Sequence, residues 1–311
     1  MDKKNYKYLI DGNFNYDLSN VMSDPLLVSI SNYIGVNKNY VYIGSGISQF
    51  ISVIINLNCW DTIYLPDPEF GLYSKTAEAN NKKCVKIFCL YCDDFINKIK
   101  KYDTKPNDLL CISSPRWFSG EMFTKEQILE IVSIFKGTIM IDEAYVDYSN
   151  DEIGMLELCL KNENVILARS FSKKFYASGL RTGYIVTKKN LTNLRGVLIP
   201  PYSVTTYSSN FFIKLLSDID MLELFYNTRQ YVIKNRNIVY DMLKDQFNII
   251  KSSSNFLTII FSSNNELEEA YSALKGLSGI QIFKENIFYI KIWISDEKFS
   301  QIVINRLKEL K

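Results

Sequence analysis

The sequence predicts an α/β fold built on a large, mainly parallel sheet. Three short runs rich in branched residues have the pattern of buried strands: Val85 to Phe88, Leu109 to Ile112 and Thr138 to Ile141. A helix expected over Lys125 to Phe135 separates the last two, and strand–helix–strand alternation is typical of parallel pairing with right-handed crossovers. The chain has 311 residues, 47% of them hydrophobic, which is enough for a large and a small domain.

The N-terminal part adds an arm, two helices and a glycine-rich turn. Residues 1–25 are polar and turn-rich and are expected to form an extended arm. Leu26 to Ile34 is apolar at helical spacing, and Val41 to Ile43 leads into Gly44-Ser45-Gly46-Ile47-Ser48-Gln49 before an apolar helix from Phe50 to Leu57. A glycine turn that opens a helix suits an anion, because free backbone N–H groups and the helix dipole point at it. A plain glycine turn with a serine N-cap is the alternative.

The second half of the chain predicts a linking helix and a smaller α/β unit. Helices are expected over Thr205 to Leu216 and over Met221 to Leu243. The tail then alternates strands and helices over Phe256 to Ile260, Leu267 to Leu274, Ile287 to Ile294 and Ser300 to Leu310. We therefore expect three parts, namely the arm (1–25), a large domain (26–218) and the linking helix with a small C-terminal domain (219–311).

The composition excludes several classes of function. With 36 basic and 34 acidic residues the net charge is +2, so no nucleic-acid or membrane-binding face is indicated, and no apolar run approaches the ~20 residues of a membrane span. Histidine is absent, which excludes histidine-based triads, zinc sites and general bases. Cys89 and Cys92 form a lone Cys-x-x-Cys pair, so no metal site is predicted, and six scattered cysteines favour a reducing cytoplasm.

A basic, hydroxyl-rich stretch from Ser170 to Tyr184 follows an apolar strand expected at Val165 to Ala168 and runs into a second one at Gly183 to Val186. A lysine between apolar strands is desolvated, which lowers its pKa, and the neighbouring Lys174 and Arg181 act in the same direction. A neutral amine is the nucleophile that forms a Schiff base with an aldehyde, and serine hydroxyls with an arginine suit a phosphate dianion. An aldehyde that carries a phosphate is pyridoxal phosphate. A basic surface loop between two strands is the alternative.

Within this stretch, Ser-Phe-Ser-Lys followed by Ser-Gly-Leu-Arg-Thr-Gly-Tyr resembles the cofactor-lysine signature of the fold-type I, class I/II aminotransferases. The closest branch contains histidinol-phosphate aminotransferase and threonine-phosphate decarboxylase. The resemblance implies an aspartate-aminotransferase-like fold, with a large doubly wound domain and a small α/β domain, and a homodimer. It also implies that Lys173, and not Lys174, is the Schiff-base lysine. Ser170 and Arg181 would hold the cofactor phosphate, with Ser172 beside them.

The remaining cofactor-binding positions that the resemblance implies are Gly46, Ile47, Ser48, Phe70, Asp142 and Tyr145. The glycine turn would bind the phosphate, and the Phe70 ring would stack on the pyridine ring. Asp142 would pair with the protonated pyridine nitrogen, and Tyr145 would hydrogen-bond the phenolic oxygen. Lys173 follows Asp142 by 31 positions, which fits the family. The alternative for Phe70 is a core aromatic residue at the start of a helix. The alternative for Asp142 is a helix cap after a strand.

The substrate side departs from the family. Trp117 falls where the family has an asparagine that donates to the cofactor's phenolic oxygen, and Lys291 falls where it has an arginine that binds a substrate carboxylate or phosphate. A lysine is a point charge and cannot make the bidentate fork that fits a carboxylate. Trp117 and Arg116 are expected to line the substrate pocket, together with Asn15 of the arm. The alternative for Trp117 is sequence drift in a loop that tolerates substitution. The alternative for Lys291 is a solvated charge on a half-exposed strand.

These inferences predict a pyridoxal-phosphate-dependent aminotransferase that acts on a small amine or carbonyl substrate, phosphorylated or not, with a small-molecule amino donor and acceptor. Lys173 would serve as general base and acid, and Asp142 would stabilise negative charge through the pyridine nitrogen. A decarboxylase of a phosphorylated amino acid would use the same two residues and is the first alternative. A catalytically inactive family member, whose decayed pocket is marked by Trp117 and Lys291, is the second.

Overall fold

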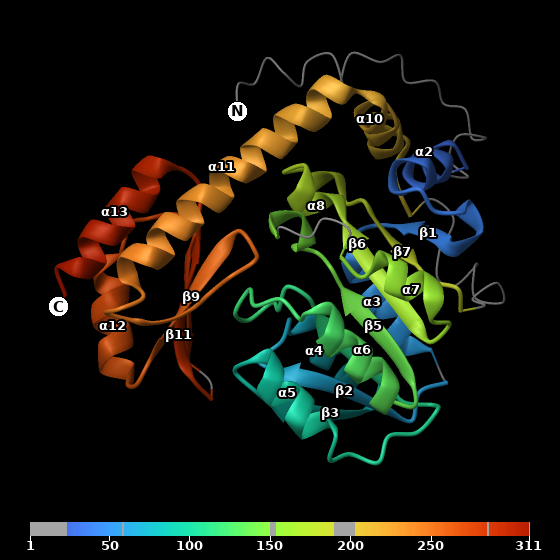
Figure 1. Cartoon of the computed structure of the whole chain (residues 1–311), viewed down its shortest axis with the longest axis horizontal. Helices are drawn as coiled ribbons and strands as arrows, with labels where there is room; N and C mark the ends of the chain where they lie inside the picture. The colour runs from blue at the N-terminus through green and yellow to red at the C-terminus, as the bar shows by residue number, and fades with distance from the viewer. Residues whose placement is uncertain (1–23, 58, 150–153, 190–202, 285, 311) are drawn as a thin grey trace.

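Two β-sheets, each with its own helices, organise the part of the chain that the structure describes (Figure 1). The structure is a computed structural model, and it describes residues 24–57, 59–149, 154–189, 203–284 and 286–310. Almost all of the expected arm, including Asn15, lies outside these residues. We call the seven-stranded sheet the large sheet and the four-stranded sheet the small sheet.

The large sheet confirms the expected α/β class and its mainly parallel pairing. Its spatial order is β1-β7-β6-β5-β4-β2-β3. From β3 across to β6 every neighbouring pair is parallel, whereas β7 pairs antiparallel with both β6 and β1. The strands are β1 (Val41–Gly44), β2 (Thr62–Asp67), β3 (Lys83–Phe88), β4 (Leu109–Ser113), β5 (Thr138–Asp142), β6 (Val165–Ser170) and β7 (Gly183–Val186).

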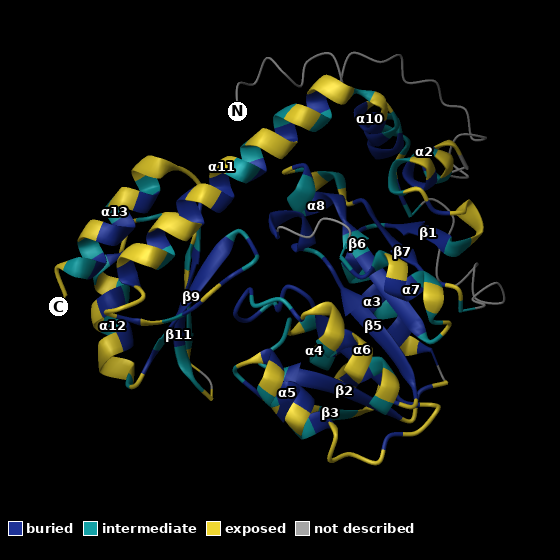
Figure 2. Cartoon of the chain, in the orientation of Figure 1, coloured by how far each residue is buried: buried dark blue, intermediate teal, exposed yellow. Residues whose placement is uncertain are grey.

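Helices cover both faces of the large sheet, and this explains its continuous apolar strands. In β5, Ile139 and Ile141 pack into one hydrophobic core and Met140 into another, since alternate side chains point to opposite faces. The helices beside this sheet are α2 (Asp24–Ile34), α3 (Ile47–Asn56), α4 (Leu72–Ala79), α5 (Cys92–Ile99), α6 (Lys125–Ile134), α7 (Leu156–Lys161), α8 (Phe171–Lys174) and α10 (Thr206–Ser217). Figure 2 shows the resulting pattern, with dark blue strands and yellow outer helix faces.

The prediction of a buried strand over Val85 to Phe88 is wrong in its burial. The strand exists as β3, but it pairs only with β2 and so forms an edge of the large sheet. Lys83, Lys86 and Phe88 are exposed, and Ile87 is the residue of β3 that is buried. An edge strand with charged residues is a common way to discourage pairing with another chain.

The small sheet is antiparallel throughout and has the order β10-β11-β9-β8. The expected strands and helices of the tail are present to within a few residues, whereas β8 and β10 were not predicted, because β8 is short and β10 is only half-buried. The elements are α11 (Ile219–Leu243), β8 (Asn248–Ile250), β9 (Phe256–Phe261), α12 (Asn264–Ala273), β10 (Ile280–Lys284), β11 (Phe288–Trp293) and α13 (Glu297–Lys308). The long α11 reaches from α10 to this sheet (Figure 1).

The loop of residues 116–120 joins the two sheets. The Thr258 hydroxyl of β9 donates to the Phe118 carbonyl at 2.7 Å, and the Ser253 N–H donates to the Gly120 carbonyl at 2.6 Å. The ring of Phe118 meets the ring of Tyr289 edge to face, with centroids 4.9 Å apart. Because this loop follows β4 of the large sheet, these contacts hold the small sheet against the carboxyl ends of the parallel strands.

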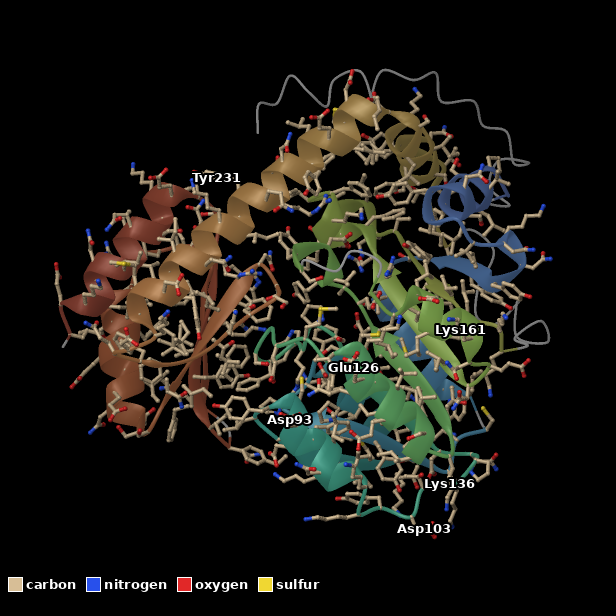
Figure 3. All side chains as sticks on the ribbon, viewed as in Figure 1. Asp93, Asp103, Glu126, Lys136, Lys161 and Tyr231 are labelled. Carbon is tan, nitrogen blue, oxygen red and sulfur yellow. The ribbon has the colours of Figure 1, made fainter. Side chains whose placement is uncertain are left out.

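The outer surface is polar and contributes little to this arrangement. Figure 3 labels Lys136 and Asp103 near the rim of the large-sheet side, where Lys136 Nζ lies 2.9 Å from an Asp103 carboxylate oxygen. Exposed ion pairs of this kind add little to stability. Tyr231 of α11, also labelled, accepts a hydrogen bond from the Glu297 N–H at the start of α13. None of the described helices is both long enough and apolar enough to cross a membrane.

The joining loop leads to a stability prediction. Gly120 has φ +73°, and a Cβ there would lie 2.0 Å from Ser252 Oγ. Gly276 has φ +85°, and a Cβ there would meet nothing within 4 Å. Gly276→Ala should therefore lose only about 1–2 kcal/mol for the left-handed backbone, whereas Gly120→Ala should lose about 1–3 kcal/mol more for overpacking. Urea unfolding measures both losses, and equal losses would contradict the close approach at Gly120.

Candidate functional site

A cavity of about 200 Å³ lies at the carboxyl ends of the central parallel strands, beside the start of α3. The last residues of β4, β5 and β6, which are Ser113, Asp142 and Ser170, all line it. Ligands of open α/β sheets bind at this edge, because the loops after the strands diverge there and leave a crevice. The predicted residues Tyr145, Ser172 and Lys173 line the same cavity.

Residues from other segments close the cavity from the opposite side. They come from the start of α3, from the segment before α4, from the joining loop and from the turn after α8, and they are Ile47, Ser48, Phe70, Trp117 and Arg181. The tertiary structure thus brings together predicted positions from five segments of the sequence. Asn15 lies outside the described residues, and Lys291 is fully buried behind the cavity wall.

Lys173 presents an amine without an acidic partner to this cavity. It lies in the short helix α8, and within the described residues its Nζ takes part in no ion pair or hydrogen bond. The ammonium lies 5.6 Å from the centroid of the Tyr145 ring. Burial lowers the pKa of Lys173, and the positive charge of Arg181 lowers it further. A larger fraction of neutral amine makes this side chain a better nucleophile and proton acceptor.

The next residue, Lys174, has the opposite environment. Its ammonium forms an ion pair with Asp147, and both side chains are nearly buried. Although burial acts against the charged form, the Asp147 carboxylate raises the pKa of Lys174 to about 12. The expectation that Lys174 lowers the pKa of Lys173 is therefore wrong, because Asp147 balances the charge of Lys174. The two adjacent lysines are distinguished by the position of one carboxylate.

Asp142 lies at the inner end of the cavity and is almost fully buried. Its Oδ2 accepts a hydrogen bond from the Tyr73 hydroxyl at 2.9 Å, and its Oδ1 accepts one from the Ala144 N–H at 2.9 Å. Burial raises the pKa of Asp142 to about 7, although these two donors act in the other direction. No basic side chain within the described residues forms an ion pair with it. A cationic N–H group of a ligand would supply the missing counter-charge.

The opposite end of the cavity offers hydrogen-bond donors to an anion. Gly46 has φ +76°, and a Cβ there would lie 2.7 Å from Arg181 Nη2, so the arginine occupies the space that the glycine leaves. Helix α3 begins directly after Gly46, and within the described residues the N–H groups of Ile47 and Ser48 have no acceptor. Arg181 is exposed and donates to the Ser178 carbonyl at 3.0 Å, which leaves most of its N–H groups available. Such a group of donors suits a phosphate.

The wall between these ends is aromatic. The rings of Phe70 and Trp117 have centroids 6.1 Å apart with planes inclined by 42°. The Ser113 hydroxyl accepts from the Trp117 N–H at 2.6 Å and donates to the carboxylate of Glu69, so a hydrogen-bond chain supports the wall. Burial raises the pKa of Glu69 above its usual range. The hydroxyl of Tyr145 makes no hydrogen bond to any described residue, and burial raises its pKa.

Arg116 does not line the cavity as expected. Its side chain is completely buried and donates to the backbone carbonyls of Cys89, Leu90 and Pro68. It therefore ties the joining loop to the segments after β2 and β3. The interpretation of Lys291 as a solvated charge is also wrong, because β11 is paired on both sides and its Lys291 is fully buried.

Some residues of the site could not be recognised from the sequence. Tyr73 reaches Asp142 from α4, and Ser113 supports the wall from β4, and neither position carries a local signal of its role. Ser178, which also lines the cavity, belongs to the same hydroxyl-rich stretch as Lys173 and Arg181. Its position between Lys173 and Arg181 could therefore have identified it as a candidate cavity residue.

Comparison with known proteins identifies the family of the chain. A family model described as aminotransferase class I and II matches residues 12–301. A histidinol-phosphate aminotransferase of Brachyspira hyodysenteriae is 29% identical over 317 residues, which cover 97% of this chain and 86% of the relative. Another, from Thermoanaerobacter pseudethanolicus, is 24% identical over 314 residues, which cover 94% and 84%.

Solved structures share the fold. Histidinol-phosphate aminotransferase from Clostridium acetobutylicum superposes with a TM-score of 0.81 at 21% identity, covering 99% of this chain and 93% of the other. The enzyme of the same description from Sinorhizobium meliloti, in complex with pyridoxal-5'-phosphate, gives 0.79 at 15% identity, with 99% and 86% covered. L-threonine-O-3-phosphate decarboxylase from Porphyromonas gingivalis gives 0.78 at 16% identity, with 99% and 95% covered.

The raised pKa of Asp142 predicts a pH dependence of stability. Because its pKa in the folded protein is about 7, above the ordinary value of 3.8, protonation stabilises the fold. This contribution is complete below pH 4 and is lost as the pH rises through 7, and about three pKa units correspond to at most roughly 4 kcal/mol.

The matched variant is Asp142→Asn, which keeps the shape and one of the two acceptor oxygens. Urea unfolding of the protein freed of ligands, between pH 5 and 8, should show that the wild type loses stability relative to the variant as the pH rises. Glu69 and Glu143, whose pKa values burial also raises, are present in both proteins, so the difference between the two profiles reports Asp142 together with its repulsion of these two carboxylates. Parallel pH profiles would show that Asp142 titrates normally.

Proposed function

The chain belongs to the class I and II aminotransferase family, and on this premise we propose that it transfers an amino group between a small-molecule donor and a small-molecule acceptor with Lys173 as the central residue. It is a pyridoxal-phosphate-dependent transaminase of the fold type I architecture. The observation that carries the proposal for Lys173 is its amine, which faces the cavity without an acidic partner and has a lowered pKa.

The residues present fit pyridoxal phosphate. A buried carboxylate without a basic partner, Asp142, suits the protonated ring nitrogen. The donors of Arg181 and of the α3 start, around the space left by Gly46, suit the phosphate. Tyr145 has a hydroxyl that is free to donate to the phenolic oxygen. We propose that Phe70, Ser170 and Ser172 complete the cofactor site, because they line the same cavity.

The cofactor, when bound, supplies an aldehyde that condenses with amines and a ring that withdraws electrons from the carbon beside the nitrogen. Lys173 then has two roles in the proposal. Its amine would bind the cofactor's aldehyde, and as a free neutral amine it would accept the proton from the carbon that bears the substrate's amino group. In the protein without cofactor, burial and the charge of Arg181 lower the pKa of Lys173.

The other residues of the site would position the cofactor and balance its charge. Asp142, fixed by the Tyr73 hydroxyl and the Ala144 N–H, would favour the protonated form of the ring nitrogen. The wall of Phe70 and Trp117 excludes water from one side of the cavity and limits how the ring can tilt. The hydrogen bond from the Tyr148 hydroxyl to the Lys173 carbonyl, at 3.1 Å, holds α8 in place.

Two alternatives use the same site. The names of the curated relatives suggest a phosphorylated amine as the substrate. The alternative reaction is decarboxylation of a phosphorylated amino acid, since one structural relative is described as L-threonine-O-3-phosphate decarboxylase. Lys173 and Asp142 serve either reaction, and the difference lies in which bond of the substrate breaks. A protein without any turnover would be the inactive family member.

We further propose the division into a cofactor domain (26–218) and a linking helix with a small domain (219–311), supported by the two sheets of the described residues. A homodimer is proposed from the resemblance to the family. The cytoplasm is proposed as the compartment, because all six cysteines are free thiols.

The first test of the function is covalent attachment. After borohydride reduction of the protein with pyridoxal phosphate, mass spectrometry of peptides should find the cofactor on Lys173. Lys173→Ala should lose the adduct. Lys174→Arg is the matched control, because it keeps the positive charge beside Asp147 and should keep the adduct. An adduct on residue 174 in the wild type, or one that survives in Lys173→Ala, would disprove the role of Lys173.

The second test separates the reactions. The protein is incubated with single amines, including glutamate and phosphorylated amino acids, and both the carbonyl product and released carbon dioxide are measured. Transamination should give one carbonyl product per cofactor and no carbon dioxide. Carbon dioxide released in equal amount to an amine product, with no carbonyl product, would establish the decarboxylase. No product from any amine would favour the inactive member.

A further inference from the structure

The aromatic wall of the cavity is held rigidly from behind. Trp117 lines the cavity, and its ring meets the ring of Phe283 in β10 edge to face, with centroids 5.6 Å apart. Its N–H donates to the Ser113 hydroxyl, and its carbonyl accepts a hydrogen bond from the Lys291 ammonium. The backbone of Trp117 is thus held on both sides, by the large sheet and by the small sheet.

Lys291 lies between aromatic rings. Its Nζ is 3.9 Å from the ring centroid of Trp117 and 3.9 Å from that of Phe256, and burial lowers the pKa of Lys291 well below its ordinary value. The side chain is fully buried and is not part of the cavity wall, and within the described residues it forms no ion pair. A ligand in the cavity meets the Trp117 ring and not the amine of Lys291.

The positive charges that reach the cavity are few. Among the described residues that line it, the cationic side chains are those of Lys173 and Arg181. Both belong to the segment that follows β6, and the proposed function uses both for the cofactor. The part of the wall formed by Phe70 and Trp117 presents only ring faces and edges. An anion placed there would be desolvated without a counter-charge, and a ring face repels negative charge.

We propose that Trp117 determines the specificity of this site and selects amines whose far end is apolar or aromatic and uncharged. The inference rests on the proposed function, since it concerns the amine that reacts there. Lys291 is a positioning residue, because it holds the Trp117 ring and backbone without touching the substrate. A phosphorylated amine would fit only with its phosphate directed away from this wall.

The kinetic test compares amines of similar length but different ends. The wild type should convert 2-phenylethylamine with kcat/KM at least about tenfold above that for O-phosphoethanolamine or 3-aminopropionate. Trp117→Ala should lose this preference, which is measured as the ratio of the kcat/KM values for 2-phenylethylamine and O-phosphoethanolamine, so that any change in cofactor binding cancels. Trp117→Phe should keep most of the preference. Preference for the anionic amines in the wild type, or an unchanged preference in Trp117→Ala, would overturn the proposal.

Lys291→Met separates positioning from direct binding. It removes the amine, and with it the hydrogen bond to the Trp117 carbonyl, but keeps the length. A positioning role therefore predicts a few-fold higher KM for 2-phenylethylamine and an unchanged rank order of the amines. If Lys291 instead binds a substrate anion, the variant would lose kcat/KM for the anionic amines alone. That result would overturn the proposal.

A binding experiment makes the test independent of turnover. The uncharged, unreactive 2-phenylethanol should quench the tryptophan fluorescence of the protein with bound cofactor more effectively than glutarate does. Trp117→Phe should abolish the quenching. Trp60→Phe is the matched control and should keep it, because Trp60 is buried away from the cavity and donates to the Ile54 carbonyl. Stronger binding of glutarate would overturn the proposal even in a protein that turns over no amine, whereas absence of the Lys173 adduct would count against the proposed function alone.

Discussion

The site depends on one electrostatic arrangement, an amine that is partly buried with a cation beside it and no acid. Lys173 and Lys174 are adjacent in α8, yet Asp147 pairs with Lys174 alone. Burial and Arg181 therefore lower the pKa of Lys173, while the pKa of Lys174 rises to about 12. A carboxylate within reach of Lys173 would remove the neutral amine on which the proposed chemistry depends. Asp142, the acid that lines the cavity, is held by Tyr73 and the Ala144 N–H instead.

The joining loop of residues 116–120 connects this chemistry to the fold. It follows β4, contributes Trp117 to the cavity and accepts hydrogen bonds from Thr258 and Ser253 of the small-sheet side. Gly120 allows this close approach, because the Ser252 side chain occupies the space that a Cβ at position 120 would need. Because the same loop contacts the small sheet and forms part of the cavity wall, a shift of the small sheet would also move the wall.

Much of the architecture could be predicted, and the reason is periodicity. The runs that became β4 and β5 are apolar on both faces, because helices cover both sides, and that pattern survives in the sequence. The edge strand β3 was predicted as buried because its short apolar run resembles theirs, and only pairing shows that it has one neighbour. Tyr73 was missed because its partner Asp142 lies 69 positions away, and no local pattern reports such a contact.

The sequence by itself determined the mainly parallel α/β class and the family, together with a cofactor-binding stretch whose residues are close in the chain. Lys173 and Arg181 are eight positions apart, so local spacing carries their relation. The tertiary structure alone decided the environment of Lys291, which appears in the sequence as one charge in an apolar strand. Whether that side chain reaches solvent, a ligand or a ring depends on segments far away in the sequence, since Trp117 belongs to the joining loop and Phe256 to β9. Burial and counter-charge are properties of packing, and these decide what an ionisable side chain can do.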